Sequence, residues 1–247
     1  MEERPRALLL KFPGTNCDAE TARALESVGF ATEIAPISTV TRATLDGIRL
    51  VVFSGGFSYG DYVMSGRIAS LVTEQKVDAA LKEFRDAGGY LLGICNGFQI
   101  LTQLGLLPSG SLVHNTSGRY QCQWVKLINR APNSPFLKHL PETFEVPMAH
   151  AEGRFVTADP AEADGYLASG LAALTYAEDV NGSFAGIAGL QDETGRVFGL
   201  MPHPERFMGA RDHYDPDWNG GEKEKGSGYF LFQSLYEAVT NNETATA

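Results

Sequence analysis

The chain has 247 residues, of which 43% are hydrophobic, and a formal net charge of −10 at pH 7. This length suffices for one large α/β domain or two small ones, and we favour one. The lysines and arginines are scattered, so the charge disfavours binding to nucleic acid or to an anionic membrane. No apolar stretch is long enough for a signal peptide or a membrane span. The three cysteines form no CxxC pair, which favours free thiols and a cytoplasmic location.

The first half of the chain alternates between apolar runs and amphipathic segments. The runs are short, end at Gly, Pro or Ser, and lie at Ala7–Phe12, Ile48–Phe53 and Tyr90–Ile94. Helical spacing appears between them in "CDAETARALESVG", which stops at Gly29, and in "TEQKVDAALKEFRDAGG". Strands that are almost wholly apolar are typical of parallel sheets covered by helices on both faces.

The second half has a different pattern of polar and apolar residues. The stretches "QWVKLI", "FEVPMA" and "RVFGLM" alternate in polarity and predict antiparallel or mixed additions to the same sheet. A last helix is expected over Tyr229–Val239, after a polar, glycine-rich segment from Ala210 to Gly228 that we expect to be a mobile loop. The predicted fold is therefore a single domain over residues 1–247, an open, mostly parallel sheet with helices on both faces and antiparallel additions.

The stretch "YLLGICNGFQIL" places a cysteine between two glycines. A strand that enters a helix through G-x-C-x-G copies the serine elbow G-x-S-x-G, because Gly93 and Gly97 leave room for a sharp turn. Cys95 then lies at the carboxyl end of its strand, where open α/β sheets bind ligands, and near a helix N-terminus, which favours the thiolate. Cys95 is the predicted nucleophile, with a buried packing cysteine as the alternative. Cys17, in "FPGTNCD", lacks paired glycines and is interpreted as structural.

A nucleophilic thiolate needs a base, and His203 in "GLMPHPER" is the candidate. The flanking Pro202 and Pro204 exclude a helix and favour extended chain. Side chains two residues apart in extended chain project to one side, so Glu205 can orient the imidazole. Cys95, His203 and Glu205 would form a nucleophile, a base and an orienting group. An exposed His and Glu in a capped loop is the alternative.

A second H-x-E pair, His150 and Glu152, lies in "MAHAEGRF". Two such pairs and a cysteine could ligate zinc, but neither pair has the i, i+4 spacing of a helical two-histidine site, and we predict no metal. The remaining histidines, His114, His139 and His213, are interpreted as solvated loop residues.

Acyl chemistry also requires donors for an oxyanion. The loop "SGGFSYGDY" follows the strand Ile48–Phe53 and matches neither of the common phosphate-binding motifs. Gly55 and Gly56 can expose backbone N–H groups beside the Cys95 turn. Together with the N–H of Asn96, the residue after the nucleophile, they form the predicted oxyanion hole.

The order and spacing of "GICNGFQIL", "SGGFSYGDY" and "MPHPER" resemble the class I (triad) glutamine amidotransferases, whose fold is flavodoxin-like. The resemblance runs from Leu8 to about Phe207 and resumes in the last helix. It implies for Cys95, His203 and Glu205 the same three roles given above. It also implies substrate contacts at four further positions, which are Gln99, His150, Glu152 and Gly153.

The motifs "FPGTNCD", "AHAEGRF" and "NGSFAGIAG" are similar to the branch of this family that serves purine synthesis. That similarity implies a subunit that hydrolyses L-glutamine to glutamate and ammonia through a cysteine thioester. The ammonia would pass to a large synthase subunit that uses ATP and Mg²⁺ to make formylglycinamidine ribonucleotide, with a small accessory subunit. No cofactor is expected in this chain itself.

The sequence leaves three other functions open. The chain could supply ammonia to a different synthase, such as one that makes pyridoxal phosphate or a cytidine nucleotide. It could be a cysteine hydrolase of the related peptidase-like α/β group, although the "HPE" segment disfavours this. It could also be a non-catalytic regulatory module that keeps the fold.

Overall fold

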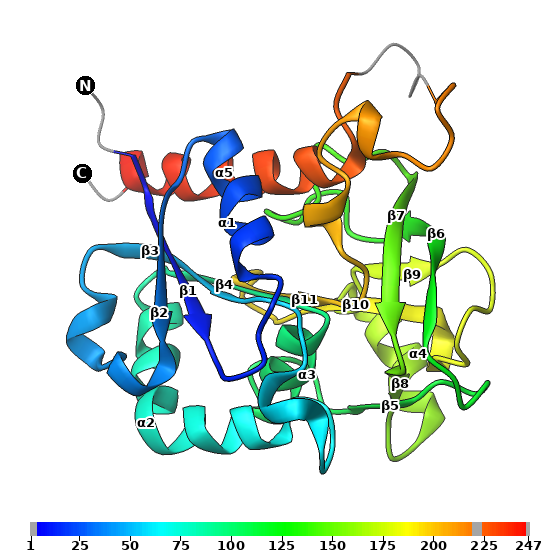
Figure 1. Cartoon of the computed structure of the whole chain (residues 1–247), viewed down its shortest axis with the longest axis horizontal. Helices are drawn as coiled ribbons and strands as arrows, with labels where there is room; N and C mark the ends of the chain where they lie inside the picture. The colour runs from blue at the N-terminus through cyan, green and yellow to red at the C-terminus, as the bar shows by residue number, and fades with distance from the viewer. Residues whose placement is uncertain (1–3, 219–223, 246–247) are drawn as a thin grey trace.

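The computed structural model describes residues 4–218 and 224–245. Its centre is a nine-stranded sheet with the order β2-β1-β3-β4-β11-β10-β9-β6-β7, and a separate pair of strands, β5 and β8, lies beside it (Figure 1). Within these ranges no helix has the length and apolar character needed to cross a membrane.

One half of the sheet is parallel. Neighbouring strands in this half share one direction, and they are β1 (Arg6–Lys11), β2 (Ala31–Pro36), β3 (Ile48–Phe53), β4 (Tyr90–Ile94) and β11 (Val197–Leu200). The four residues from Leu50 to Phe53 and all of β4 are buried. Their apolar sequences follow from this burial, because helices cover both faces of the parallel half.

The other half of the sheet is antiparallel. It continues from β11 through β10 (Ile187–Gln191), β9 (Leu174–Tyr176), β6 (Gln121–Asn129) and β7 (Thr143–His150). The small antiparallel pair consists of β5 (Ser111–His114) and β8 (Glu152–Val156).

Helices cover the two faces of the parallel half. In Figure 1, α1 (Asp18–Val28) and α5 (Ser227–Ala245) lie on one side, and α2 (Arg67–Asp86) and α3 (Asn96–Gln103) lie on the other. A further helix, α4 (Pro160–Ser169), accompanies the antiparallel half. Gly29 ends α1 at φ 119°, a left-handed conformation that glycine adopts without strain.

The predicted fold class is confirmed, with local differences. The strand β2 was not predicted because it forms one edge of the sheet, where five of its six residues are at least partly exposed. Helix α2 begins at Arg67, six residues before the predicted segment, and α5 extends beyond both predicted ends. Strand β11 pairs in parallel with β4 and antiparallel with β10, so the sheet changes direction at β10.

The segment expected to be a mobile loop, Ala210–Gly228, is described only in part, since residues 219–223 lie outside the described ranges. Its mobility stays a prediction. The described portion contains ring contacts: His213 stacks on Trp218 with centroids 5.0 Å apart and lies 4.6 Å from Trp124. The interpretation of His213 as a solvated residue was wrong, because it is only 9% exposed inside this aromatic cluster.

Candidate active site

A cavity of about 80 Å³ lies where the parallel strands end. The segments that follow β1, β3, β4 and β11 contribute Cys17, Gly56, Cys95 and His203 to its wall. The end of β7 adds His150. Carboxyl ends of parallel strands meet at one edge of an open sheet, so this is the place where such folds bind ligands.

Cys95 occupies the turn between β4 and α3. Its backbone has φ 52° and ψ −106°, a combination that non-glycine residues rarely adopt. The turn is tight because a Cβ on Gly97 would lie 1.8 Å from the Phe53 carbonyl oxygen, and one on Gly93 would lie 2.6 Å from the Gly97 oxygen. The Cys95 side chain is largely buried but lines the cavity. The structure therefore has the geometry of a nucleophile elbow.

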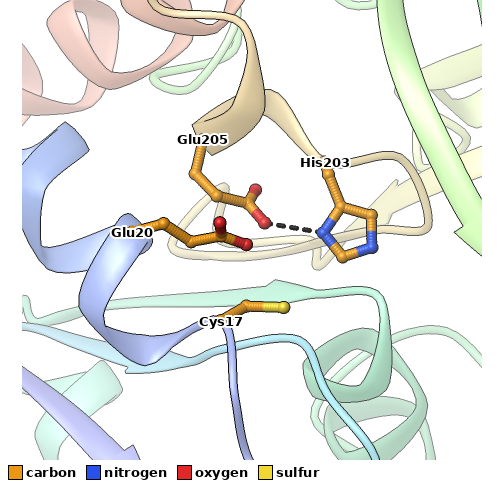
Figure 2. A group of neighbouring side chains, drawn as sticks. All are labelled: Cys17, Glu20, His203 and Glu205. Carbon is orange, nitrogen blue, oxygen red and sulfur yellow. Dashed lines mark hydrogen bonds and ion pairs between the residues drawn. The ribbon is translucent and has the colours of Figure 1, made fainter.

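His203 and Glu205 form a buried pair beneath the cavity. The imidazole Nδ1 lies 2.6 Å from the carboxylate Oε1 (Figure 2), and both side chains are almost fully buried. The sequence predicted an extended backbone between these two residues, and this prediction was wrong. Pro204–Arg206 is a 3₁₀ turn, because proline suits the first position of a helical turn. The turn, rather than an extended chain, brings Glu205 back under the imidazole.

The surroundings of His203 favour its charged form. Burial by itself lowers the pKa of this imidazole, but the carboxylate of Glu205 and then the Cys95 sulfur raise it. The resulting pKa lies well above the usual value. These neighbours therefore favour the imidazolium form of His203. This group can give a proton to a leaving group, and as an imidazole it can take one back.

Gly55 lies close to His203, Cys95 and Cys17 at the same time. A Cβ on Gly55 would lie 2.9 Å from His203 Cε1, 3.5 Å from Cys95 Cβ and 3.3 Å from Cys17 Sγ. Only a glycine fits here without displacing one of the three. The predicted nucleophile and base thus both lie close to one glycine and line the same cavity.

The three residues of the predicted oxyanion hole lie around the Cys95 turn. Gly56 lines the cavity and adopts φ 141°, while Asn96 is the first residue of α3. The N–H of Phe57 is already used, since it donates to the Gly14 oxygen at 3.1 Å. The N–H groups of Gly55, Gly56 and Asn96 stay the candidates for holding an oxyanion.

Gln99 and Glu152, predicted from the resemblance, are connected. The Gln99 amide donates to the Glu152 backbone oxygen at 2.5 Å, and Asn96 donates to Gln99 Oε1 at 3.0 Å. The Glu152 carboxylate accepts from the Ser65 N–H at 3.0 Å. Both Gln99 and Glu152 line the cavity, so the network fixes two polar groups at its wall.

His150 is buried in the same wall and has no hydrogen-bond partner at either ring nitrogen among the described residues. Burial, helped by the nearby charge of His203, lowers its pKa to about 4. His150 is therefore neutral at pH 7 and free to bond a ligand. Gly153 lies directly against this ring, where a Cβ would approach Cε1 to 2.2 Å, and is absent from the described cavity wall.

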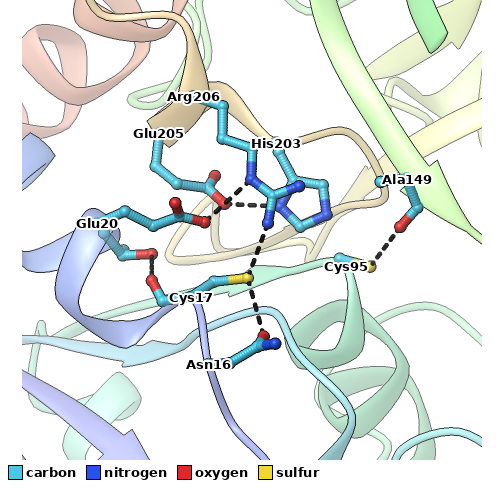
Figure 3. Close-up of polar contacts among 9 residues, drawn as sticks. Asn16, Cys17, Glu20, Cys95, Ala149, His203, Glu205 and Arg206 are labelled. Atoms are coloured by element: carbon cyan, nitrogen blue, oxygen red, sulfur yellow. Dashed lines mark hydrogen bonds and ion pairs between the residues drawn. The ribbon is translucent and has the colours of Figure 1, made fainter. Parts of the chain in front are cut away.

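Several polar residues of this wall were not predicted, among them Arg206 and Asp61. The guanidinium of Arg206 donates to Glu20 Oε1 at 3.0 Å and to Cys17 Sγ at 3.2 Å (Figure 3). Burial raises the pKa of the Asp61 carboxyl, to which Asn96 donates at 3.3 Å. Two features of the sequence could have indicated them: Arg206 directly follows the "HPE" segment, and Asp61 lies in the glycine-rich loop.

Cys17 was interpreted as structural, and the structure places it in the cavity wall. It precedes α1 without making a side-chain cap, and its sulfur faces the cavity near His203. Burial raises the pKa of this thiol, so it is a poorer nucleophile than its position suggests. The cavity wall thus contains two thiols, of which only Cys95 stands on an elbow.

Comparison with known families identifies the class. Residues 4–239 match the CobB/CobQ-like glutamine amidotransferase domain. The chain belongs to this family of glutamine amidotransferases, and the predicted resemblance is confirmed.

Two individual relatives are similar to most of this chain. Subunit PurQ of phosphoribosylformylglycinamidine synthase from Thermotoga maritima is 40% identical over 207 residues, which cover 83% of this chain and 89% of that protein. The subunit of the same name from Zymomonas mobilis is 39% identical over 236 residues, 95% of this chain and 99% of the relative.

Solved structures share the fold of this chain. The structure of PurLQS from Thermotoga maritima contains a chain that superposes with a TM-score of 0.78 at 34% identity, covering 98% of this chain and all of that one. A glutamine amidotransferase from the same organism reaches 0.61 at 18% identity, covering 96% of this chain and 99% of its own length, and supports the fold alone.

Proposed function

We propose that this chain is the glutaminase subunit of a phosphoribosylformylglycinamidine synthase. It hydrolyses L-glutamine to glutamate and ammonia, and it delivers the ammonia to a large synthase subunit for purine synthesis in the cytoplasm. The observation that carries the proposal is the strained Cys95 elbow, which shares one cavity with the buried His203–Glu205 pair. The relatives named PurQ and the PurLQS structure support the choice of synthase.

In the first half of the reaction, the Cys95 thiolate attacks the side-chain carboxamide carbon of glutamine. A sulfur–carbon bond forms, and the N–H groups of Gly55, Gly56 and Asn96 stabilise the oxyanion. His203 gives its proton to the amide nitrogen, the carbon–nitrogen bond breaks, and ammonia leaves. Glu205 orients the imidazole throughout.

In the second half, the now neutral His203 takes a proton from water, and the resulting hydroxide attacks the thioester. The carbon–sulfur bond breaks, glutamate leaves, and the thiolate and imidazolium are restored. The elevated pKa of His203 supports this cycle because the resting imidazolium is the acid that the first half needs.

Four residues are proposed to form the substrate site, two by contact with the substrate and two by positioning those contacts. His150 offers a neutral, unpartnered imidazole, and Gln99 positions the segment that contains Glu152. The Glu152 carboxylate supplies the charge for the glutamine ammonium. Gly153 acts indirectly in this proposal, by leaving room for the His150 ring.

The ammonia acceptor is proposed to be bound by the partner. ATP and Mg²⁺ belong to the large synthase subunit, and a small accessory subunit completes the complex. The name PurLQS, which joins three subunit letters, supports this composition.

The test uses the complex reconstituted with its large synthase subunit. Cys95→Ala should abolish synthesis driven by glutamine and leave synthesis driven by ammonium salts nearly intact. Cys122→Ala, which removes an exposed thiol, is the matched control and should keep both activities. Equal loss of both activities in Cys95→Ala would mean that Cys95 is needed for assembly rather than for chemistry.

A further inference from the structure

Four neighbouring side chains, two of which line the cavity, combine donor types that bind thiophilic divalent cations. Each offers one ligand atom, all of these atoms lie within 4.8 Å of one another (Figure 2), and the residues are Cys17, Glu20, His203 and Glu205. Thiolate, imidazole and carboxylate are the ligands of protein zinc sites. Tetrahedral bonds of about 2.0 to 2.3 Å require ligand separations of about 3.3 to 3.8 Å, so movements of about 1 Å would complete the coordination.

A second observation points to the same place. Glu205 is almost completely buried, and its Oε2 has no hydrogen-bond partner within the described part of the chain. A buried carboxylate oxygen without a partner is unfavourable, and coordination to a cation would satisfy it. The cavity gives access, because Cys17 and His203 both line it.

One resident cation competes for this position. The Arg206 guanidinium already donates to Glu20 and to the Cys17 sulfur, as Figure 3 shows. An incoming metal ion must displace these two hydrogen bonds. Arg206 therefore limits the affinity of the cluster for metal, and its removal should increase that affinity.

We propose that this four-residue cluster is a site for Zn²⁺ or a similar thiophilic cation, which inhibits glutamine hydrolysis rather than assisting it. If the ion binds His203 Nδ1, it breaks the bond to Glu205 and leaves the proton of the neutral ring on Nε2. If it binds Nε2, it occupies the nitrogen that must exchange protons with the reacting groups. In both cases the imidazole ceases to act as acid and base. The inhibition rests on the proposed glutaminase function, but the binding does not.

Binding is tested on the full-length chain, with Co²⁺ as a spectroscopic probe and Zn²⁺ as its competitor. The background carries Cys95→Ser and Cys122→Ser, so that Cys17 is the remaining thiol. We expect one Co²⁺ per chain with a thiolate-to-cobalt absorption band, displaced by Zn²⁺ and not by Mg²⁺. Adding Cys17→Ser should remove the band, and adding Glu20→Gln should weaken binding at least tenfold.

Arg206→Gln in the same background should tighten Co²⁺ binding several-fold. Near-ultraviolet circular dichroism checks that each variant is folded. Absence of the thiolate band in the folded background protein, or equal affinity with and without Cys17, would overturn the proposal. Neither result depends on glutaminase activity, so failure here is distinguishable from failure of the proposed function.

Inhibition is tested in the chain with all three cysteines. Zn²⁺ should inhibit glutamine hydrolysis, and Glu20→Gln should raise the half-inhibitory concentration at least tenfold when each protein is compared with its own metal-free activity. An unchanged half-inhibitory concentration would instead assign the inhibition to Cys95 and His203 alone and would reject the inhibitory role of the cluster.

Discussion

Cys95 and His203 acquire their chemistry from their immediate surroundings. The cysteine backbone is held at φ 52° by close packing of two glycines, and such strain persists only where the surrounding fold enforces it. The pKa of the histidine is raised because the buried Glu205 carboxylate at 2.6 Å and the Cys95 sulfur together outweigh its desolvation. Both effects act over a few ångströms and are sensitive to single substitutions.

His203→Ala should lower glutamine turnover by about 10²- to 10⁴-fold, because it removes the acid and base. Glu205→Gln should lower it less, since it disturbs only the orientation and charge of the imidazole. Steady-state ammonia release measures both, with Glu178→Gln, a change at an exposed residue, as the control. If both active-site variants lose equally little activity, the assigned pairing is wrong.

His150 should make stability depend on pH. Its folded-state pKa is about 4, against an ordinary value of 6.5, so between these values the unfolded chain binds the extra proton. Stability is therefore fully present above pH 6.5 and falls as the pH drops toward 4. Between pH 7.5 and pH 5 the loss from this group is about 2 kcal/mol.

Urea unfolding at the two pH values measures that difference. His150→Gln should reduce the pH-dependent loss by about 2 kcal/mol relative to the unsubstituted chain, whatever its effect at pH 7.5. An identical pH dependence in both proteins would show that His150 is protonated to the same extent in the folded and unfolded states.

At the scale of elements, the site depends on how closely α3 approaches the sheet. A Cβ on Gly97, in the first turn of α3, would collide with the Phe53 carbonyl at the end of β3. The pairing of β3, β4 and β11 then aligns the strand ends that precede the cavity segments. The glycines of the elbow thus fix the distance between elements as well as the shape of one turn.

Gly97→Ala should destabilise the chain by more than about 2 kcal/mol, because the helix must move away from the strand. Gly165→Ala in α4 is the matched control, since nothing lies within 4 Å of the added Cβ. That change should stabilise by about 0.5 to 1 kcal/mol through helix propensity. Denaturant midpoints report both, and similar effects of the two substitutions would refute the close-packing argument.

At the scale of the whole molecule, the last helix packs beside the first. Helix α5 packs against α1 and against the turn Pro204–Arg206, so the C-terminal helix supports the segment that contains Glu205. Leu231, Phe232, Leu235 and Val239 provide its buried contacts. The last helix is therefore part of the same core as the first strands.

Leu235→Ala should cost about 2 to 5 kcal/mol of unfolding free energy, as expected for a fully buried leucine. Gln233→Ala, on the partly exposed side of the same helix, should change it by no more than about 0.5 kcal/mol. Thermal or urea unfolding compares the two. A small effect of Leu235→Ala would mean that α5 contributes little to the core.

The sequence by itself determined three strands of the parallel half, Ala7–Phe12, Ile48–Phe53 and Tyr90–Ile94, and the cysteine elbow, because apolar runs, helical periodicity and paired glycines are local signals. It also indicated the residues of the proposed triad, whose roles stay predictions. It did not determine the edge strand β2, the turn at Pro204–Arg206 or the surroundings of Cys17. Partners such as Arg206 and Cys17 are 189 positions apart, and only the tertiary structure decides which of such distant side chains share a cavity, because their contacts depend on the packing of the whole core.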